Sequence, residues 1–466
     1  MSNFGSRGWG TSRVWGTLAA VWLGLSALSG FATDMLTWQT NQNRVSADIK
    51  NGELFPLLEQ IASATGWHVF VEPDTSKTIS AKFKDLPPGD ALHLLLGDLN
   101  FAMVPQTNTS PKLFVFRSRM QAATQRVQPI KTTEKDGKAK IIPNELIVRL
   151  KPGAKIEDLA KLLGAKVTGH IDSLNAYRLQ FDSADAAEAA RAQLASNPEV
   201  TSVDSNFSID RPPGASPMLS TAIPAPELQL KPPPSDGRVI VGLVDTAVQP
   251  LGNGLDSFLL KQQSVAGDPQ LDPNSPAHGT SMAETILRSL SSYSQGSTSV
   301  QILPVDVYGP NPTTSTFDVA NGIVTAVNGG GNPINLSLGS DGDSSFLQSV
   351  IQSAIASNIV FIAAAGNTPV TTPFYPAAYL GVMGVTAIDQ GQLDSYANRG
   401  SWIPLGAPGT APVLFDNQEW YVTGTSTSAA YTSGLAAGYM EANHGSASQT
   451  ESFLRTKLGI KITPAQ

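Results

Sequence analysis

The chain has 466 residues, which is long enough for several domains that each bury a core. Charged residues make up only 15%, while Gly (41) and Pro (33) are abundant, and this balance indicates a globular, loop-rich protein and not a disordered one. The net charge of −7 without a basic stripe argues against a nucleic-acid partner, and the lack of cysteine excludes disulfides, thiolate catalysis, Cys-ligated zinc and iron–sulfur clusters.

The N-terminus has the pattern of an export signal. Arg7 and Arg13 precede 19 uncharged, mostly apolar residues, 14–32, and Asp34 follows. A positive region, an apolar core and small residues at the end are typical of a secretory signal peptide. An uncleaved anchor helix is the alternative, because such a stretch is nearly long enough to span a bilayer. Residues 1–33 are therefore expected to direct export, to the periplasm, the cell surface or the medium.

A first small α+β module is predicted over residues 34–120. Apolar residues recur at helical spacing in 52–66, and a second helix is expected in 89–99. Short strands are expected at 68–72, 79–83, 101–105 and 112–118. The patterns "LFPLLEQIASATG" and "DALHLLLGDLNF" resemble the secretin and TonB short N-terminal domain, and this resemblance implies an envelope protein as partner.

A polar linker, residues 121–140, separates this module from a second one over 141–210. Strand and helix patterns alternate there in the order β-α-β-β-α-β, the split βαβ or ferredoxin-like arrangement. No cluster of reactive side chains accompanies the pattern. No reactive site is therefore expected in this module.

Residues 211–237 hold 8 of the 33 prolines, so an extended linker that does not pack as a domain is predicted. From 238 to 466 continuous apolar strands alternate with helical patterns. Such strands predict a parallel sheet with helices on both faces, an α/β domain.

Polar residues follow these strands at the edge where open α/β sheets place their sites. Asp245 ends the first strand, and His278 opens a helical pattern. The stretch "VTGTSTSAAYTSG", 422–434, offers several hydroxyls, although a Ser or Thr there could also serve only as a helix cap. Amide hydrolysis needs a nucleophile, a base, a group that orients the base, and donors for the oxyanion. Since only His278 and His444 lie in this half, and His444 is at its far end, His278 is the candidate base.

The motifs "VDT", "HGT", "NLSLG", "AAAGN" and "GTSTSAAYTSG" resemble, in this order, those of subtilisin-like serine proteases over 238–466. The resemblance implies that Ser426 is the nucleophile, that His278 is general base and then acid, and that Asp245 orients His278. It also implies that the amide of Asn367 and the backbone N–H of Ser426 form the oxyanion hole.

The same resemblance implies two walls of a substrate pocket, one after each of two neighbouring strands. These candidate substrate-binding residues are Ser337, Leu338, Gly339, Ala364, Ala365 and Gly366. Thr368 follows the oxyanion Asn where some relatives carry an acid, so an apolar or broad preference is expected at the residue before the scissile bond. Ala247, Ser281 and the run 427–431 depart from the family pattern and leave the substrate open.

The second module resembles the inhibitory propeptides of this family, through "PNELIVRLKPGAKIEDLAKLLGAKV" and "NPEVTSVDSN". A protease has to be exported inactive, and such a unit can cover the enzyme while its last strand lies in the substrate cleft. Self-cleavage is therefore expected within 207–220.

Relatives often carry calcium, and Asp341 with Asp343 is the one acid pair in a Gly-rich loop of this half, but a solvated turn is favoured there. No metal and no cofactor is predicted. The expected partners are a protein or peptide substrate and the chain's own propeptide. Two alternatives stay open, a pseudoprotease and an envelope adaptor whose protease half processes only itself.

Overall fold

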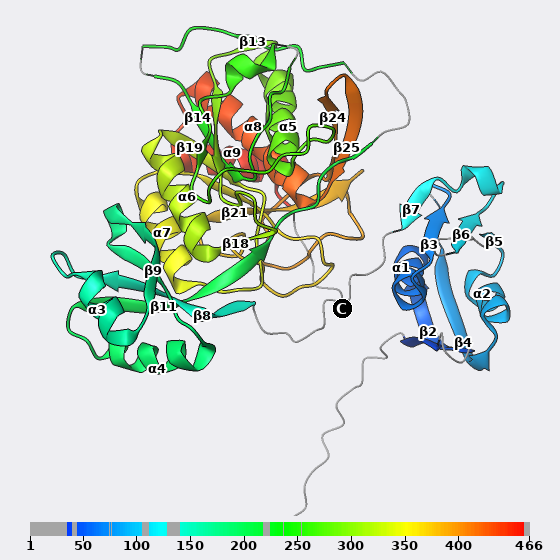
Figure 1. Cartoon of the computed structure of the whole chain (residues 1–466). Coiled ribbons are helices and arrows are strands. Elements are labelled where there is room, and N and C mark those ends of the chain that lie inside the picture. The colour runs from blue at the N-terminus through cyan, green and yellow to red at the C-terminus, as the bar shows by residue number, and fades with distance from the viewer. Residues whose placement is uncertain are drawn as a thin grey trace, which may run out of the picture. The chain divides into compact units, whose positions relative to one another are not determined.

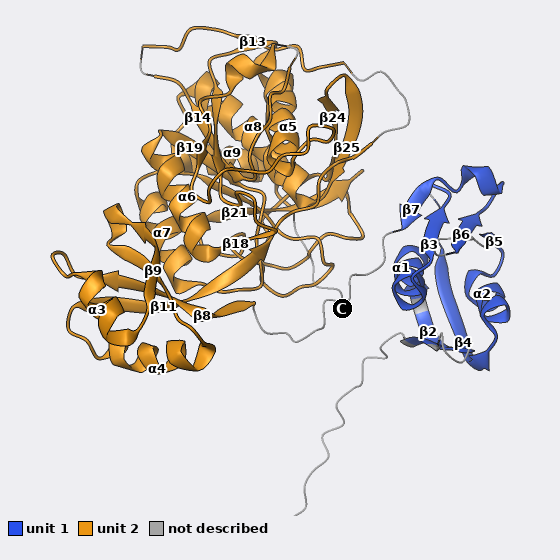
Figure 2. Ribbon diagram, viewed as in Figure 1, with its two compact units in different colours: residues 1–133 blue, residues 134–466 orange. Residues whose placement is uncertain are grey.

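The computed structural model describes residues 35–39, 44–73, 75, 77–104, 111–127, 140–217, 224–235, 237–252 and 254–460. The predicted signal, residues 1–33, lies outside this part. The chain forms two compact units, Met1–Thr133 and Glu134–Gln466 (Figure 2). Among the described residues, none of the helices combines the length and the apolar character needed to cross a membrane.

The first unit is an α+β module with two helices between two sheets. One sheet has the order β1-β2-β4 and the other the order β5-β6-β3-β7. The elements are β1 (Met35–Gln39), β2 (Arg44–Glu53), α1 (Leu54–Thr65), β3 (His68–Val71), β4 (Thr78–Leu86), α2 (Pro88–Leu96), β5 (Asn100–Val104), β6 (Lys112–Phe116) and β7 (Gln125–Val127). Apolar residues of both helices and both sheets form one core of its own.

Three strands of this unit differ from the sequence prediction. β1 and β2 were not expected, and β7 falls in the range predicted as linker, where it pairs antiparallel with β3. Both β1 and β7 are short, and neither shows a clear alternation of apolar and polar residues. They form strands because they pair with the edge of a neighbouring strand, and the local sequence pattern carries no information about that pairing.

The second module has the predicted β-α-β-β-α-β order, with the four strands arranged β11-β8-β10-β9. Its elements are β8 (Ile141–Leu150), α3 (Ile156–Leu163), β9 (Lys166–Ile171), β10 (Ala176–Gln180), α4 (Ala184–Ala195) and β11 (Val200–Asp210). Both helices pack on one face of this sheet, over a core that includes Leu146, Leu159 and Leu194.

The C-terminal domain is built on a mainly parallel sheet in the order β15-β17-β14-β19-β20-β21-β22, with β23 also paired to β21. These strands are β14 (Ile240–Asp245), β15 (Gln263–Ser264), β17 (Gln301–Asp306), β19 (Gly331–Leu336), β20 (Phe361–Ala364), β21 (Val382–Asp389), β22 (Gln392–Leu393) and β23 (Leu405–Pro408). Nearly all residues of β14, β17, β19 and β20 are buried. The predicted α/β parallel-sheet domain is thereby confirmed.

Helices cover both faces of the sheet (Figure 1). α6 and α7 share one core with β17 and β19, whereas α5, α8 and α9 pack in cores on the opposite face. The bounds of these helices are α5 (His278–Ser294), α6 (Thr316–Asn328), α7 (Ser345–Ala356), α8 (Thr425–Asn443) and α9 (Ala447–Leu458). A hairpin of β24 (Thr410–Phe415) and β25 (Gln418–Thr423) leads directly into α8, and short β16 (Ser297–Thr298) and β18 (Thr313–Ser315) complete the domain.

The second module is docked on the C-terminal domain through α6 and α7 (Figure 1). Ile147 and Ile209 belong to the same buried cluster as Phe317 of α6 and Phe346 of α7. β11 continues past its own sheet and pairs antiparallel with β18. The two domains therefore share a core and a sheet, which explains why they form a single compact unit.

Polar contacts fix the same interface. Asn206 is fully buried, and its Oδ1 accepts hydrogen bonds from the Phe317 N–H (3.1 Å) and the Thr316 hydroxyl (3.0 Å), so it caps the first turn of α6. Arg178 pairs with Asp318 at 2.8 Å and lies over the Phe317 ring. The second module thus satisfies backbone donors of the C-terminal domain as well as covering its apolar surface.

The described parts of the proline-rich segment are extended and pair with edges of the C-terminal domain, without forming a domain of their own. β12 (Ser216–Pro217) pairs with β25, and β13 (Gln229–Leu230) pairs with β16. Arg288 of α5 also donates to the Pro224 carbonyl. Proline suits these positions because edge strands do not need every backbone N–H. The proline-rich composition indicates extended backbone, and an extended segment can pair with the edge strand of a neighbouring sheet.

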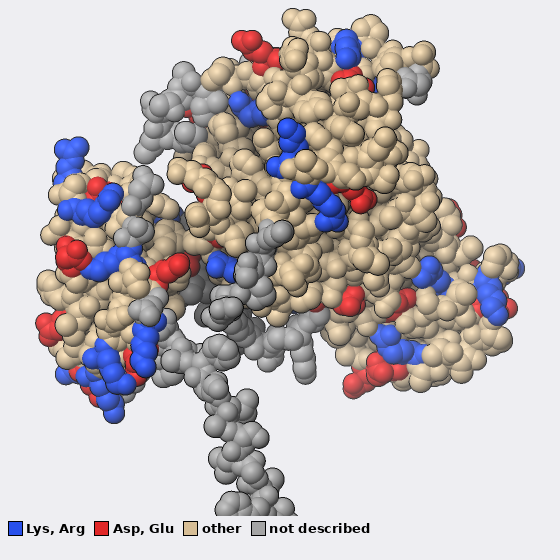
Figure 3. Space-filling view, turned by 180° about the vertical axis from the view of Figure 1, so that it is seen from behind, with Lys and Arg blue, Asp and Glu red and all other residues tan. Residues whose placement is uncertain are grey.

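The charged side chains do not gather into one sign on the face shown in Figure 3. Lys and Arg are interspersed with Asp and Glu, and most of the surface there is uncharged. Such a surface gives little long-range steering of a charged ligand.

Candidate active site

The end of β14 and the start of α5 bring Asp245 and His278 together. The Nδ1 atom of His278 lies 2.7 Å from Oδ1 of Asp245, and the two residues are 4% and 0% exposed. The Thr246 N–H also donates to Oδ1, while Oδ2 has no hydrogen-bond partner within the described part of the chain. A positive charge on the His278 ring would therefore face a buried carboxylate that no basic side chain neutralises.

Two residues of the "VDT" and "HGT" motifs explain this pairing. The hydroxyl of Thr246 accepts a hydrogen bond from the Gly279 N–H at 2.8 Å and ties the first turn of α5 to the end of β14. A Cβ atom on Gly279 would lie 2.1 Å from the Thr246 carbonyl oxygen, a distance that real side chains do not reach. Glycine is required at 279 because the helix and the strand end touch there.

Ser426 lies in the first turn of α8 and is 7% exposed. Gly424 precedes the helix with a positive φ of 150°, a backbone conformation that favours glycine. The Ser426 hydroxyl donates to the Ser337 carbonyl (3.0 Å), and within the described residues it forms no hydrogen bond with His278. Transfer of its proton to the imidazole therefore requires this hydrogen bond to be exchanged for one to His278.

The hydroxyls of Thr425 and Ser428 in the same stretch have structural partners, whereas the buried Thr427 hydroxyl has none among the described residues. Ser428 donates to the Ala407 carbonyl (3.0 Å), and Thr425 donates to Oδ1 of Asn367 (3.1 Å). Ser428 and Thr425 are fully buried. Among the candidates quoted from 422–434, the geometry favours Ser426 as the hydroxyl that opens onto the site.

Asn367 lies beside the same helix start. Its Oδ1 accepts from the Thr425 N–H at 2.8 Å, and its Nδ2 faces Gly424, 3.0 Å from where a Cβ would lie. The side chain is exposed. With its oxygen held by Thr425, the amide N–H₂ is the end that can donate to an anion forming at Ser426. The positive end of the α8 dipole points to the same place.

The two predicted pocket walls follow adjacent parallel strands. Leu336 of β19 is in register with Ala363 of β20, so the residues after them leave the sheet at one edge. The first wall is Ser337, Leu338 and Gly339, and the second is Ala364, Ala365 and Gly366. All of the predicted site residues therefore lie at the carboxyl edge of this sheet or on the helices that start there.

The chain itself crosses this edge. The Arg211 N–H donates to the Pro312 carbonyl next to β18, and Ser216 pairs with Tyr421 in β25. Between them, a Cβ on Gly214 would lie 3.6 Å from the carbonyl oxygen of Pro276, two residues before His278. Residues 211–217 thus run from one side of the site to the other, as a substrate would.

Sequence reasoning missed one buried acid next to the site. Asp306, in register with Asp245 on the neighbouring strand β17, accepts from the Tyr308 and Gly309 N–H groups and from Ser264. Burial raises the pKa of Asp306 although these hydrogen bonds oppose the effect. It shapes the turn that leads to β18 and does not touch His278. An acid after a strand is too common a signal to have identified it.

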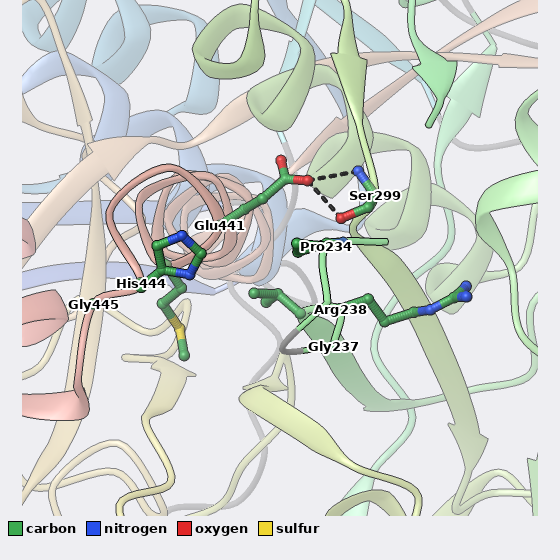
Figure 4. Close-up of a pocket in the computed structure, with 9 residues that line it drawn as sticks. Pro234, Gly237, Arg238, Ser299, Glu441, His444 and Gly445 are labelled. Carbon is green, nitrogen blue, oxygen red and sulfur yellow. Dashed lines mark hydrogen bonds between the residues drawn. The ribbon is translucent and has the colours of Figure 1, made fainter. Parts of the chain in front are cut away.

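A separate cavity of about 230 Å³ lies at the far end of α8 (Figure 4). Its lining includes Glu441, which accepts from Ser299 and Thr298 and pairs with Lys231. Burial raises the pKa of Glu441, but these donors outweigh it and the net pKa is lowered. Glu441 is 15 residues beyond Ser426 on one helix, roughly 22 Å along its axis. This cavity is not part of the candidate site.

No group of three or more His, Cys, Asp or Glu residues that could hold a metal ion occurs in the described ranges. Asp341 and Asp343 are exposed in the turn before α7. Two exposed carboxylates in one turn are too few ligands for a calcium cage.

Comparison with known proteins identifies the C-terminal domain. Residues 236–459 match the subtilase family, and residues 127–206 match the fervidolysin N-terminal prodomain. Residues 236–459 therefore form a subtilase domain, and a segment that matches the fervidolysin prodomain lies ahead of it.

Individual proteases of this family are similar to part of the chain. The chain is 31% identical over 204 residues to the thermophilic serine proteinase of Bacillus sp. (strain AK1), covering 42% of this chain and 51% of the relative. It is 35% identical over 178 residues to the thermostable alkaline protease of Halalkalibacterium halodurans, covering 37% and 49%. The match spans about half the length of these curated relatives.

Among solved structures, the epidermin leader peptide processing serine protease of Staphylococcus aureus is similar, with a TM-score of 0.50 and 16% identity. The similarity covers 66% of this chain and 91% of that one. At this identity it shows the shared fold, not a shared substrate.

Proposed function

We propose that this chain is a serine endopeptidase made as a zymogen, in which Ser426, His278 and Asp245 form the catalytic triad. The buried contact between His278 and Asp245, beside a serine at the start of a helix, is the observation that carries the proposal. The subtilase match supports the same reaction class.

In this proposal each side chain carries out one step. Ser426 Oγ attacks the substrate carbonyl carbon while Nε2 of His278 takes its proton, and Asp245 stabilises the imidazolium through Nδ1. The carbonyl oxygen becomes negative beside the Asn367 amide and the Ser426 N–H. His278 then gives the proton to the leaving amine, and water repeats the sequence on the acyl-enzyme.

The second module acts as an inhibitor of its own domain in this proposal. It shares a core with α6 and α7, caps α6 through Asn206, and continues into the segment that crosses the site. The expected self-cleavage falls within 207–220, of which 207–217 belong to the described residues. The match to a prodomain supports this role.

Export and an envelope partner are further proposals from sequence. The pattern of residues 1–33 supports export, and the first unit folds around its own core, as an interaction module would. The likeness of that unit to the secretin and TonB short N-terminal domain rests on its residue pattern alone.

Labelling and turnover of the full chain test the proposed function. A fluorophosphonate probe is expected to modify Ser426, located by peptide mapping, and the labelled sample is expected to lose hydrolysis of fluorescein-tagged casein. No label and no hydrolysis would indicate a pseudoprotease. If Ser426 is labelled and the chain cleaves itself but does not cleave casein, the envelope adaptor is favoured.

Asn367→Ala is expected to lower kcat by roughly 100- to 1000-fold with little change in KM, because the lost donor acts on the oxyanion and not on the bound peptide. Steady-state kinetics on a fluorogenic peptide measure both constants. The Asn367→Ala variant should still react with the probe, since Asp245 and His278 are untouched. A change confined to KM would instead place Asn367 in substrate binding.

A further inference from the structure

The two walls of the substrate pocket flank the Ser426 hydroxyl. Ser337, the first residue of one wall, exchanges hydrogen bonds with Ser426 in both directions, each 3.0 Å long. The other wall ends at Gly366, directly before Asn367, and the Gly366 N–H donates to the Thr425 hydroxyl. What lies between these walls decides which substrate side chain fits beside the nucleophile.

One aromatic ring lies against a glycine of each wall. A Cβ built on Gly339 would lie 2.4 Å from Cε1 of Phe374, and one built on Gly366 would lie 3.2 Å from Cδ1 of the same ring. Cδ1 and Cε1 are bonded neighbours, so a single edge of the ring faces both walls. The Phe374 side chain therefore occupies space that the two glycines would otherwise leave open.

The backbone that carries this ring is fixed to the first wall. Ser340 and Tyr375 exchange N–H···O hydrogen bonds of 2.9 and 2.8 Å, and the Ala378 N–H donates to the Phe374 carbonyl. On the second wall, Asn398 donates from Nδ2 to the Ala365 carbonyl and fills the other side of Gly366. The backbone that carries the ring is thus tied to the first wall, and Asn398 is tied to the second.

The Phe374 ring takes up space between two walls whose side chains are uncharged. The side chains of both walls and of Phe374 carry no charge, so neither an acidic nor a basic substrate residue gains a partner there. A large side chain would overlap the ring, and crowding of this kind typically costs 1–3 kcal/mol, about 10- to 200-fold in kcat/KM. The segment of the chain that crosses the site, residues 212–217, has the sequence Pro-Pro-Gly-Ala-Ser-Pro, and it contains no large side chain that would overlap the ring.

We infer that Phe374 determines specificity by limiting the residue before the scissile bond to small side chains. The inference rests on the proposed endopeptidase function and narrows the apolar or broad preference predicted from sequence. Phe374 contacts the substrate pocket but takes no part in bond breaking.

Two peptides that differ only in Ala or Phe before the scissile bond test the inference on the full chain, with active sites counted by the fluorophosphonate. Wild type is expected to favour Ala by about 10- to 100-fold in kcat/KM, and Phe374→Ala to raise kcat/KM for the Phe peptide by a similar factor. Phe374→Leu keeps most of the bulk and should keep the Ala preference.

The inference would be overturned if wild type hydrolysed the Phe peptide faster than the Ala peptide, or if labelled Phe374→Ala kept the wild-type ratio of the two kcat/KM values. Either result would leave the proposed function standing. Absence of both label and hydrolysis in wild type would refute the proposed function and the inference together. Because kcat/KM is expressed per labelled site, a fraction of misfolded variant does not alter these comparisons.

Discussion

Ser426→Ala is expected to lower kcat for peptide hydrolysis by roughly 10⁶-fold, the size of effect measured in subtilisin when its serine is removed. The Ser426 hydroxyl lies at the start of α8 beside Asn367, whereas the hydroxyls of Thr425 and Ser428 bond to structural partners. Loss of the nucleophile leaves only binding and the oxyanion donors to act on the substrate.

Ser428→Ala is the matched control. Its hydroxyl donates to the Ala407 carbonyl inside the protein, so the variant is expected to lose about 1 kcal/mol of stability and to keep its turnover. A gel of the full chain gives a second readout, since wild type should be cut within 207–220 and Ser426→Ala should stay whole. If Ser428→Ala is the inactive one, the nucleophile has been misassigned.

Asp245→Asn is expected to reduce kcat by roughly 10⁴-fold with little change in fold or KM. The asparagine can donate from its N–H₂ group to Nδ1 of His278, and the imidazole proton would then reside on Nε2. Nε2 is the nitrogen that must accept the proton of Ser426, so a protonated Nε2 cannot act as the base. The kinetics of peptide hydrolysis and the rate of fluorophosphonate labelling should fall together, because both need Ser426 to be deprotonated as it attacks.

Asp341→Asn provides the comparison for this change. Asp341 is exposed in a turn, so the same loss of one negative charge should leave kcat within about twofold of wild type. Equal losses in the two variants would mean that net charge, and not the orientation of His278, explains the effect.

Much of the domain and its candidate site could be predicted from the order of its motifs. Asp245, His278, Ser426 and Asn367 each stand where a strand ends or a helix begins, and the parallel sheet brings those points to one edge. Periodicity located the strands because both faces of the sheet are covered, which leaves continuous apolar runs in the sequence.

The features that could not be predicted depend on contacts between distant segments. Phe374 belongs to a loop with no regular pattern, and only the fold places its ring against Gly339 and Gly366. Asn206 reads as a polar residue near the end of a strand, yet it caps a helix more than a hundred residues away. Local sequence carries no signal for a partner that the tertiary structure supplies.

The segment that crosses the site has a consequence for the lifetime of the inhibited form. Pro212 and Pro213 have no backbone N–H, and cutting before either of them would require a ring nitrogen to leave. A bound peptide normally remains in such a cleft only until it is hydrolysed. Within residues 211–217, the bonds before Pro212 and Pro213 are both proline bonds of this kind, and Pro213–Gly214 is the first ordinary amide. In the proposed zymogen, the proline pair therefore removes two of the bonds at which the segment across the site could be cut by the ordinary reaction.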